Sequence, residues 1–178
     1  PKVIAALKDS YSYWVKEVGV DGFRVDTAMY APKEFFDQFF KSQDGIFSLK
    51  SDFIAFGETW ITSKPYENDA DKEIASYLDH GFNSMLDFTL MEEIRRVIKG
   101  GQPTDYLAYR LEARNETLKK GLLVTFIDNH DMERFGKGVT PNIIQQALGL
   151  ILTIPGLPVI YYGTEQYFEE TRASMFAN

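Results

Sequence analysis

Gly22-Phe23-Arg24-Val25-Asp26 is a short apolar run that ends at a carboxylate. The chain contains five short apolar runs, and four of them stop at a charged residue. The other runs are Phe53 to Phe56 before Gly57-Glu58, Phe82 to Leu86 before Asp87, Leu122 to Ile127 before Asp128, and Gly156 to Tyr162. Short strands that alternate with helices indicate an α/β fold with a parallel sheet. In a barrel of this kind the chemistry lies at the C-terminal strand ends, where these charged residues stand.

The connecting helices are predicted from apolar residues spaced three or four apart. An amphipathic helix is expected between Pro1 and Gly19, which supplies a helix stop. Three further regions have helical patterns: Lys33 to Phe40, Asp87 to about residue 119, and Thr140-Pro141 to Leu152. One helix face is expected to be buried phenylalanine, formed by Phe35, Phe36, Phe39 and Phe40.

Length and composition narrow the class of protein. The chain has 178 residues, 44% of them hydrophobic, and a complete α/β barrel needs about 250 residues. Length therefore predicts one domain or part of a larger one. The net charge of −7 argues against a nucleic-acid partner. Because the chain has no cysteine, a disulfide framework and a thiolate metal site are excluded. No apolar run reaches the length of a membrane span, so no membrane partner is expected; the compartment is left open.

Arg24 and Asp26 are two residues apart on a predicted strand, so their side chains share a face. A nearby guanidinium keeps a carboxylate ionised by lowering its pKa. An ionised, oriented carboxylate is what a nucleophile requires. The alternative is a structural Arg–Asp pair inside a barrel, and this stretch alone favours neither interpretation.

Glu58 follows an apolar strand and precedes Trp60 by two residues. Apolar and aromatic surroundings favour the neutral form of a carboxyl group, which suits a proton donor. Taken alone, a single Glu after a hydrophobic strand fits a solvated loop residue better. His130-Asp131 follows the strand that ends at Asp128, and the chain has only two histidines, so a zinc site built from protein ligands is not expected.

Together the carboxylates indicate a common site more strongly than each does alone, because the ends of parallel strands converge on one site. Two carboxylates about 5–5.5 Å apart give double displacement with retention of configuration. A third carboxylate can bind substrate hydroxyls. A competing hypothesis is a lyase or hydrolase in which four carboxylates hold a divalent metal: Glu58, Asp87, Asp128 and Asp131.

Four stretches, in family order, resemble the α-amylase family of glycoside hydrolases. They are Gly22-Phe23-Arg24-Val25-Asp26, Phe56-Gly57-Glu58-Thr59-Trp60, Phe126-Ile127-Asp128-Asn129-His130-Asp131, and the run from Gly156 to Gln166. The resemblance implies a (β/α)8 TIM barrel, with Asp26 as nucleophile and Glu58 as general acid/base. It also implies that Asp131 stabilises the transition state, that Arg24 supports the nucleophile, and that His130 contacts the sugar.

The family's first conserved stretch, on its third strand, has no counterpart here. The resemblance therefore implies that residues 1–178 are the C-terminal half of the barrel, strands four to eight, in a longer parent protein. Many amylases have Lys-His three and four residues after the nucleophile, where this chain has Met29-Tyr30. In the family the Lys helps to bind sugar and the His backbone often helps to bind calcium, and this chain has neither residue at those positions. Calcium is left as a possible ion of the parent protein, and no organic cofactor is expected.

Aromatic residues near the presumed site are candidate sugar platforms. Tyr30 and Trp60 are predicted to contact substrate, whereas Tyr161 and Tyr162 are expected to pack against the last strand. The resemblance implies retaining hydrolysis of α-glucosidic bonds, mostly α-1,4, in starch-type glucans, maltooligosaccharides or cyclodextrins. The alternatives are transglycosylation by the same family and, for the isolated segment, an inert partial barrel that self-associates through open sheet edges.

Overall fold

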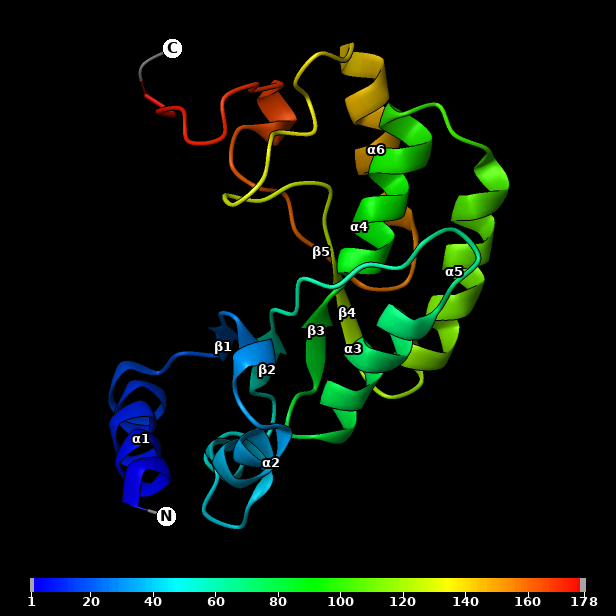
Figure 1. Ribbon diagram of the computed structural model, residues 1–178. Coiled ribbons are helices and arrows are strands. Elements are labelled where there is room, and N and C mark those ends of the chain that lie inside the picture. Colours follow the sequence, from blue (N-terminus) through cyan, green and yellow to red (C-terminus); the bar gives the residue numbers. More distant parts are fainter. Residues whose placement is uncertain (1, 177–178) are drawn as a thin grey trace.

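The centre of the molecule is a five-stranded parallel sheet whose strands follow chain order (Figure 1). The computed structural model describes residues 2–176. The strands are β1 Gly22–Val25, β2 Ile54–Gly57, β3 Ser84–Leu86, β4 Leu122–Thr125 and β5 Leu157–Pro158. Every neighbouring pair is parallel, and parallel neighbours require crossover connections. The predicted alternation of strands and helices is confirmed.

Six α-helices lie in the described part of the chain and supply or flank these crossovers. They are α1 Lys2–Tyr13, α2 Lys33–Phe36, α3 Asp69–Asp79, α4 Phe88–Ile94, α5 Thr104–Leu118 and α6 Pro141–Thr153. Wider π-helical turns extend α1, α2 and α4. Figure 1 shows α3, α4 and α5 together on one side of the sheet, with α1 and α2 near β1. None of the helices described is long and apolar enough to span a membrane.

An aromatic core lies between α2, its π-helical extension and the sheet. Phe36, Phe39 and Phe40 are buried, and Phe35 is partly buried against them. The ring of Phe36 lies 4.6 Å from that of Phe82, between centroids, in a tilted packing. The predicted buried phenylalanine face is confirmed, and it anchors the N-terminal half of the sheet to its helices.

The helix predicted before Gly19 is present, but its apolar stripe is largely exposed. Gly19 has φ +79° and closes the π-helical turn Trp14–Val18, as a glycine stop does. Val3 and Trp14 are 71% and 49% exposed, and no residue of α1 is buried. The helix lies at the edge of the sheet, where Leu7 packs against the aromatic core.

The last strand is shorter than predicted. Of the run from Gly156 to Tyr162, only Leu157–Pro158 forms β5. Val159 continues the pairing with one bond, its N–H donating to the Thr125 carbonyl at 2.8 Å. Proline has no N–H to donate to a sheet ladder, and after Val159 the chain leaves the sheet for the loop that carries Tyr161 and Tyr162.

Candidate active site

The three carboxylates predicted to be catalytic line one cavity. Asp26 follows β1 directly and Glu58 follows β2. The Glu58 N–H donates to the Val25 carbonyl at 2.8 Å, and the Ala28 N–H donates to the Glu58 carbonyl at 2.9 Å, so the two strand ends are bonded together. The cavity of about 240 Å³ is lined by Asp26, Thr27, Met29, Tyr30, Glu58, Trp60 and Asp131.

Arg24 lies between the first two carboxylates. Its Nη2 is 3.0 Å from Glu58 Oε1 and 3.4 Å from Asp26 Oδ1. The sequence predicted a pair with Asp26 alone, whereas the guanidinium is shared and is closer to Glu58. Because one nitrogen lies close to both carboxyl groups, the Arg24 guanidinium favours the ionised form of each.

The two carboxyl groups have opposite pKa shifts. A hydrogen bond with Glu58 is the largest influence lowering the pKa of Asp26, and the Arg24 guanidinium lowers it further. Burial is the largest influence raising the pKa of Glu58, and the hydrogen bond with Asp26 adds to it. Near neutral pH the arrangement therefore favours an ionised Asp26 and disfavours ionisation of Glu58. A division of this kind is what a nucleophile and a proton donor require of two neighbouring carboxyl groups.

Thr27 is a site residue that the sequence did not predict. It has φ +45° and ψ +42°, in the left-handed region that β-branched residues rarely adopt. Its backbone N–H donates to Glu58 Oε2 at 3.3 Å. This bond favours the ionised form of Glu58 and partly opposes the rise in its pKa. No sequence motif predicts a threonine in the left-handed backbone region at this position.

His130 and Asp131 contact each other at the edge of the site. His130 Nε2 is 3.0 Å from Asp131 Oδ2. Arg172 was not predicted as a site residue. Its Nη2 lies 3.4 Å from Asp131 Oδ1, and its Nε donates to the His130 carbonyl. His130 lines a neighbouring cavity of about 210 Å³ that Arg24 also borders. The pair is thus close to the first two carboxylates, with Asp131 in their cavity and His130 beside it.

The two predicted aromatic contacts both border the cavity but differ in support. Tyr30 is 80% exposed. Trp60 is 45% exposed, and its ring stacks on buried Phe88 with centroids 5.3 Å apart and planes 26° apart. Trp60 therefore presents a supported apolar face, whereas no ring packs against Tyr30 among the described residues.

The family model described as "Alpha amylase, catalytic domain" matches residues 1–177. This chain belongs to the α-amylase family. Curated relatives include the cyclomaltodextrin glucanotransferase of Thermoanaerobacterium thermosulfurigenes, 33% identical over 90% of this chain and 22% of its own length. The α-amylase of Niallia circulans is 34% identical over 90% of this chain and 29% of its own length. The chain thus spans about a quarter of the length of these relatives.

Solved structures of α-amylase family members have the same fold. An Anoxybacillus α-amylase superposes with a TM-score of 0.85 at 29% identity, covering 99% of this chain and 40% of that one. The cyclomaltodextrin glucanotransferase CldA superposes with a TM-score of 0.81 at 39% identity, covering 96% of this chain and 34% of that one. The predicted fold class, part of a TIM barrel, is confirmed.

Two carboxylates of the metal hypothesis are committed to other partners in this α-amylase family chain. Asp87 is buried, accepts from Arg114 Nε at 2.8 Å and caps α4 through the Leu90 N–H. Asp128 is buried and accepts from the Phe135 N–H and the Thr164 hydroxyl. Residues 2–176 contain no group of three or more His, Cys, Asp or Glu side chains arranged to hold a metal. The four carboxylates therefore do not form the donor set that the hypothesis requires.

Tyr161 and Tyr162 frame a buried arginine, a role beyond the packing expected for them. The Arg134 guanidinium lies 4.0 Å from the Tyr161 ring centroid and 5.0 Å from that of Tyr162. Arg134 Nη1 also donates to the Thr164 hydroxyl at 3.0 Å. These contacts join the loop after β4, which carries His130 and Asp131, to the loop after β5.

Proposed function

We propose that the protein containing this chain cleaves α-glucosidic bonds, mostly α-1,4, in starch-type glucans, maltooligosaccharides or cyclodextrins with retention of configuration. Asp26 attacks the anomeric carbon while Glu58 donates its proton to the leaving glycosidic oxygen. The bond from carbon to the leaving oxygen breaks as the bond to the Asp26 carboxylate forms. Glu58, now ionised, then removes a proton from the incoming hydroxyl group, which displaces Asp26.

The remaining residues have supporting roles in this proposal. Arg24 keeps Asp26 ionised, and Asp131 with His130 holds the distorted ring. Trp60 and Tyr30 contact neighbouring sugar rings. The Thr27 N–H fits the second step, since it favours the ionised Glu58 that must act as a base.

The observation that carries the proposal is the opposite pKa shift of two carboxyl groups around one guanidinium. Asp26 has a lowered pKa and Glu58 a raised one, and Arg24 contacts both. A structural ion pair of the kind considered from the sequence needs no such division. Double displacement needs one group charged and the other protonated at the start of the same step.

Transglycosylation is the second candidate. It uses the same two steps but accepts a sugar hydroxyl in place of water. Relatives 33–35% identical to this chain carry the name cyclomaltodextrin glucanotransferase, which favours it, whereas a 34% identical relative is an α-amylase. Chromatography of the products from a maltooligosaccharide separates the two: shorter linear products indicate hydrolysis, and cyclic or longer products indicate transfer.

We further propose that residues 1–178 are the C-terminal half of the catalytic barrel, strands four to eight. β1 and β5 are the outer strands of the described sheet, and strand edges of this kind pair readily with other strands. The isolated segment is accordingly expected to be inactive and to self-associate. Sedimentation at several protein concentrations tests the association independently of catalysis.

The deciding experiment compares the isolated chain, its full-length parent and variants of that parent on a chromogenic maltooligosaccharide. Asp26→Asn is expected to abolish most turnover, and Glu58→Gln to lower kcat/KM by about 10²–10⁴-fold. Asp69→Asn is the matched control, because it neutralises an exposed carboxylate of α3 outside the cavity. Turnover by Asp26→Asn at the parental rate would remove Asp26 from the nucleophile role.

A further inference from the structure

Arg110, a buried residue of α5, bonds to the loop that carries Trp60. We propose that Arg110 is a positioning residue: it clamps the loop of residues 59–68, between β2 and α3, and so holds the Trp60 ring in the cavity. The clamp itself is independent of the glucan assignment. Its effect on sugar binding rests on the proposed function.

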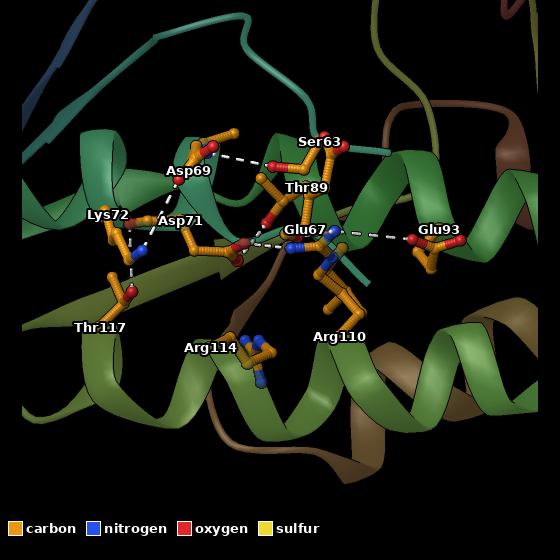
Figure 2. Close-up of polar contacts among 12 residues, drawn as sticks. Ser63, Glu67, Asp69, Asp71, Lys72, Thr89, Glu93, Arg110, Arg114 and Thr117 are labelled. Carbon is orange, nitrogen blue, oxygen red and sulfur yellow. Dashed lines mark hydrogen bonds and ion pairs between the residues drawn. The ribbon is translucent and has the colours of Figure 1, made fainter. Parts of the chain in front are cut away.

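The Arg110 guanidinium is fully buried and contacts two carboxylates and two carbonyls (Figure 2). Nη1 pairs with Asp71 of α3, and Nη2 lies 3.7 Å from Glu93 Oε2 of α4. Nη2 also donates to the Glu67 carbonyl at 3.0 Å and to the Lys64 carbonyl at 3.5 Å. The two carboxylates fix the guanidinium, which leaves its second nitrogen directed at the loop backbone.

The two carbonyls belong to the ends of one tight turn. The Glu67 N–H donates to the Lys64 carbonyl at 3.1 Å, with Pro65 second and Tyr66 third in the turn. Tyr66 has φ +65°, the left-handed value that a type II turn requires at its third position and that glycine usually supplies. A tyrosine persists in this conformation only where the surroundings hold it there.

Several contacts provide that hold. The Tyr66 hydroxyl donates to Asp105, and its ring packs edge-on against Tyr106 and Tyr109 of α5. Arg110 donates to the carbonyls at both ends of the same turn, those of Lys64 and Glu67. The loop is thus tied to α5 at its far end, while Trp60 at its near end stacks on Phe88.

The link from Arg110 to the cavity is short. Four positions separate Trp60 from Lys64 in the chain. Between them, the buried Ser63 hydroxyl accepts from the Ala70 N–H at 3.1 Å and ties the loop to the start of α3. Release of the turn at Lys64–Glu67 therefore leaves Trp60 held by its stacking on Phe88 and by Ser63, with greater freedom to leave the cavity wall.

Arg114 provides a matched control in the same helix. It is as buried as Arg110, one helical turn away, and pairs with buried Asp87 at 2.8 Å. Its described hydrogen bonds do not reach the 59–68 loop. Both residues are cations in a buried network, so their loss disturbs the network comparably, but only Arg110 bonds to the loop.

The test compares Arg110→Met with Arg114→Met in this chain, in a Trp14→Phe background that leaves Trp60 as the only tryptophan. Arg110→Met is expected to accelerate hydrogen exchange of the amides of residues 61–64, 66 and 67 at least tenfold. It is also expected to raise acrylamide quenching of Trp60 at least twofold. Arg114→Met is expected to leave both within twofold of the parent. Unchanged exchange in Arg110→Met, or equal acceleration in both variants, overturns the proposal.

Arg110→Lys keeps the proposal testable if Arg110→Met does not fold. Lysine retains a charge opposite Asp71 but lacks the planar fork that serves Asp71 and the loop carbonyls together. The rate of amide hydrogen exchange in the 59–68 loop is then expected to lie between the rate in the Trp14→Phe background and that of a released loop. An exchange rate in Arg110→Lys equal to that of the background overturns the proposal. These readouts need no sugar. Absence of maltoheptaose binding by the full-length protein would count against the proposed function and leave the clamp standing.

Discussion

Two clusters in this molecule are built from arginines and carboxylates, but they differ in contact with water. In the active-site cluster, Arg24 and Asp26 have side chains that are 34% and 66% exposed. In the network between α3, α4 and α5, Arg110 and Asp71 are 0% and 5% exposed (Figure 2). The first cluster is therefore partly hydrated, although its Glu58 side chain is only 6% exposed, whereas the second is closed to water.

The two clusters also differ in the pKa values of their carboxyl groups. In the active-site cluster two carboxyl groups share one guanidinium, and their pKa values move in opposite directions. In the buried network Arg110 also contacts two carboxylates, Asp71 and the more distant Glu93, while Arg114 pairs with Asp87. There burial raises the pKa of Asp71. The first cluster thus combines one carboxyl group whose ionised form is favoured with one whose protonated form is favoured, whereas the ion pairs of the buried network join α3, α4 and α5.

The largest expected effect on stability comes from removing one side of a buried pair. Asp71→Ala leaves Arg110 with only the more distant Glu93 as a carboxylate partner, and breaking a buried pair from one side costs about 3–5 kcal/mol. Urea unfolding at pH 7 measures this cost. Arg24→Gln is the matched change at the active site and is expected to cost less than half as much, because Arg24 is partly hydrated. Equal losses of unfolding free energy in the two variants would show that the partial hydration of Arg24 does not lower the cost of removing it.

The pH dependence of the free energy of unfolding is expected to show an effect of intermediate size. Burial raises the pKa of Glu58 above its ordinary 4.5, so the folded chain holds its proton more tightly than the unfolded chain. Between pH 4.5 and the folded pKa, the free energy of unfolding therefore falls as the pH rises. Asp26 contributes the opposite slope below pH 3.8, because its folded pKa is lowered.

Glu58→Gln is expected to remove the fall in stability above pH 4.5. Asp26→Asn is expected to move the Glu58 pKa back toward 4.5, since it removes the ionised partner that raises it. Carboxyl carbon NMR shifts of Glu58, followed through pH 3–9 in the parent and in Asp26→Asn, measure the change. The same Glu58 titration in both proteins would show that the two groups act independently.

The strand pattern was predictable because hydrophobic alternation is a local property. Phe23 and Val25 pack against the core and Arg24 turns away from it, as their spacing indicates. Glu58 was predictable as a strand-end carboxylate, and it gained significance from resemblance to a family. The short length of β5 was harder to predict from the sequence. Pro158 has no N–H to donate to the neighbouring strand, and this limits the pairing.

Apart from the Arg24–Asp26 contact, the charged contacts of the two clusters were not predictable, because they join residues distant in sequence. Arg110 is 39 positions from Asp71 and 43 from Glu67. From the sequence, a single arginine on a helix is expected to face solvent. Arg110 is buried only because three helices pack around it. Arg172 likewise reaches Asp131 from 41 positions away. Neither spacing nor composition carries that information.

Thr27 gives the smallest predicted effect and the finest test of the active-site cluster. At φ +45° a β-branched residue carries a steric cost that glycine lacks, so Thr27→Gly is expected to raise the free energy of unfolding by about 0.5–1 kcal/mol. The variant keeps the N–H that donates to Glu58, so the Glu58 titration is expected to stay as in the parent. Thr140→Gly is the control: Thr140 has φ −76° at the start of α6, where the same change is expected to cost about a few tenths of a kcal/mol. Destabilisation by Thr27→Gly as large as that by Thr140→Gly would mean that the turn after Asp26 stores no strain.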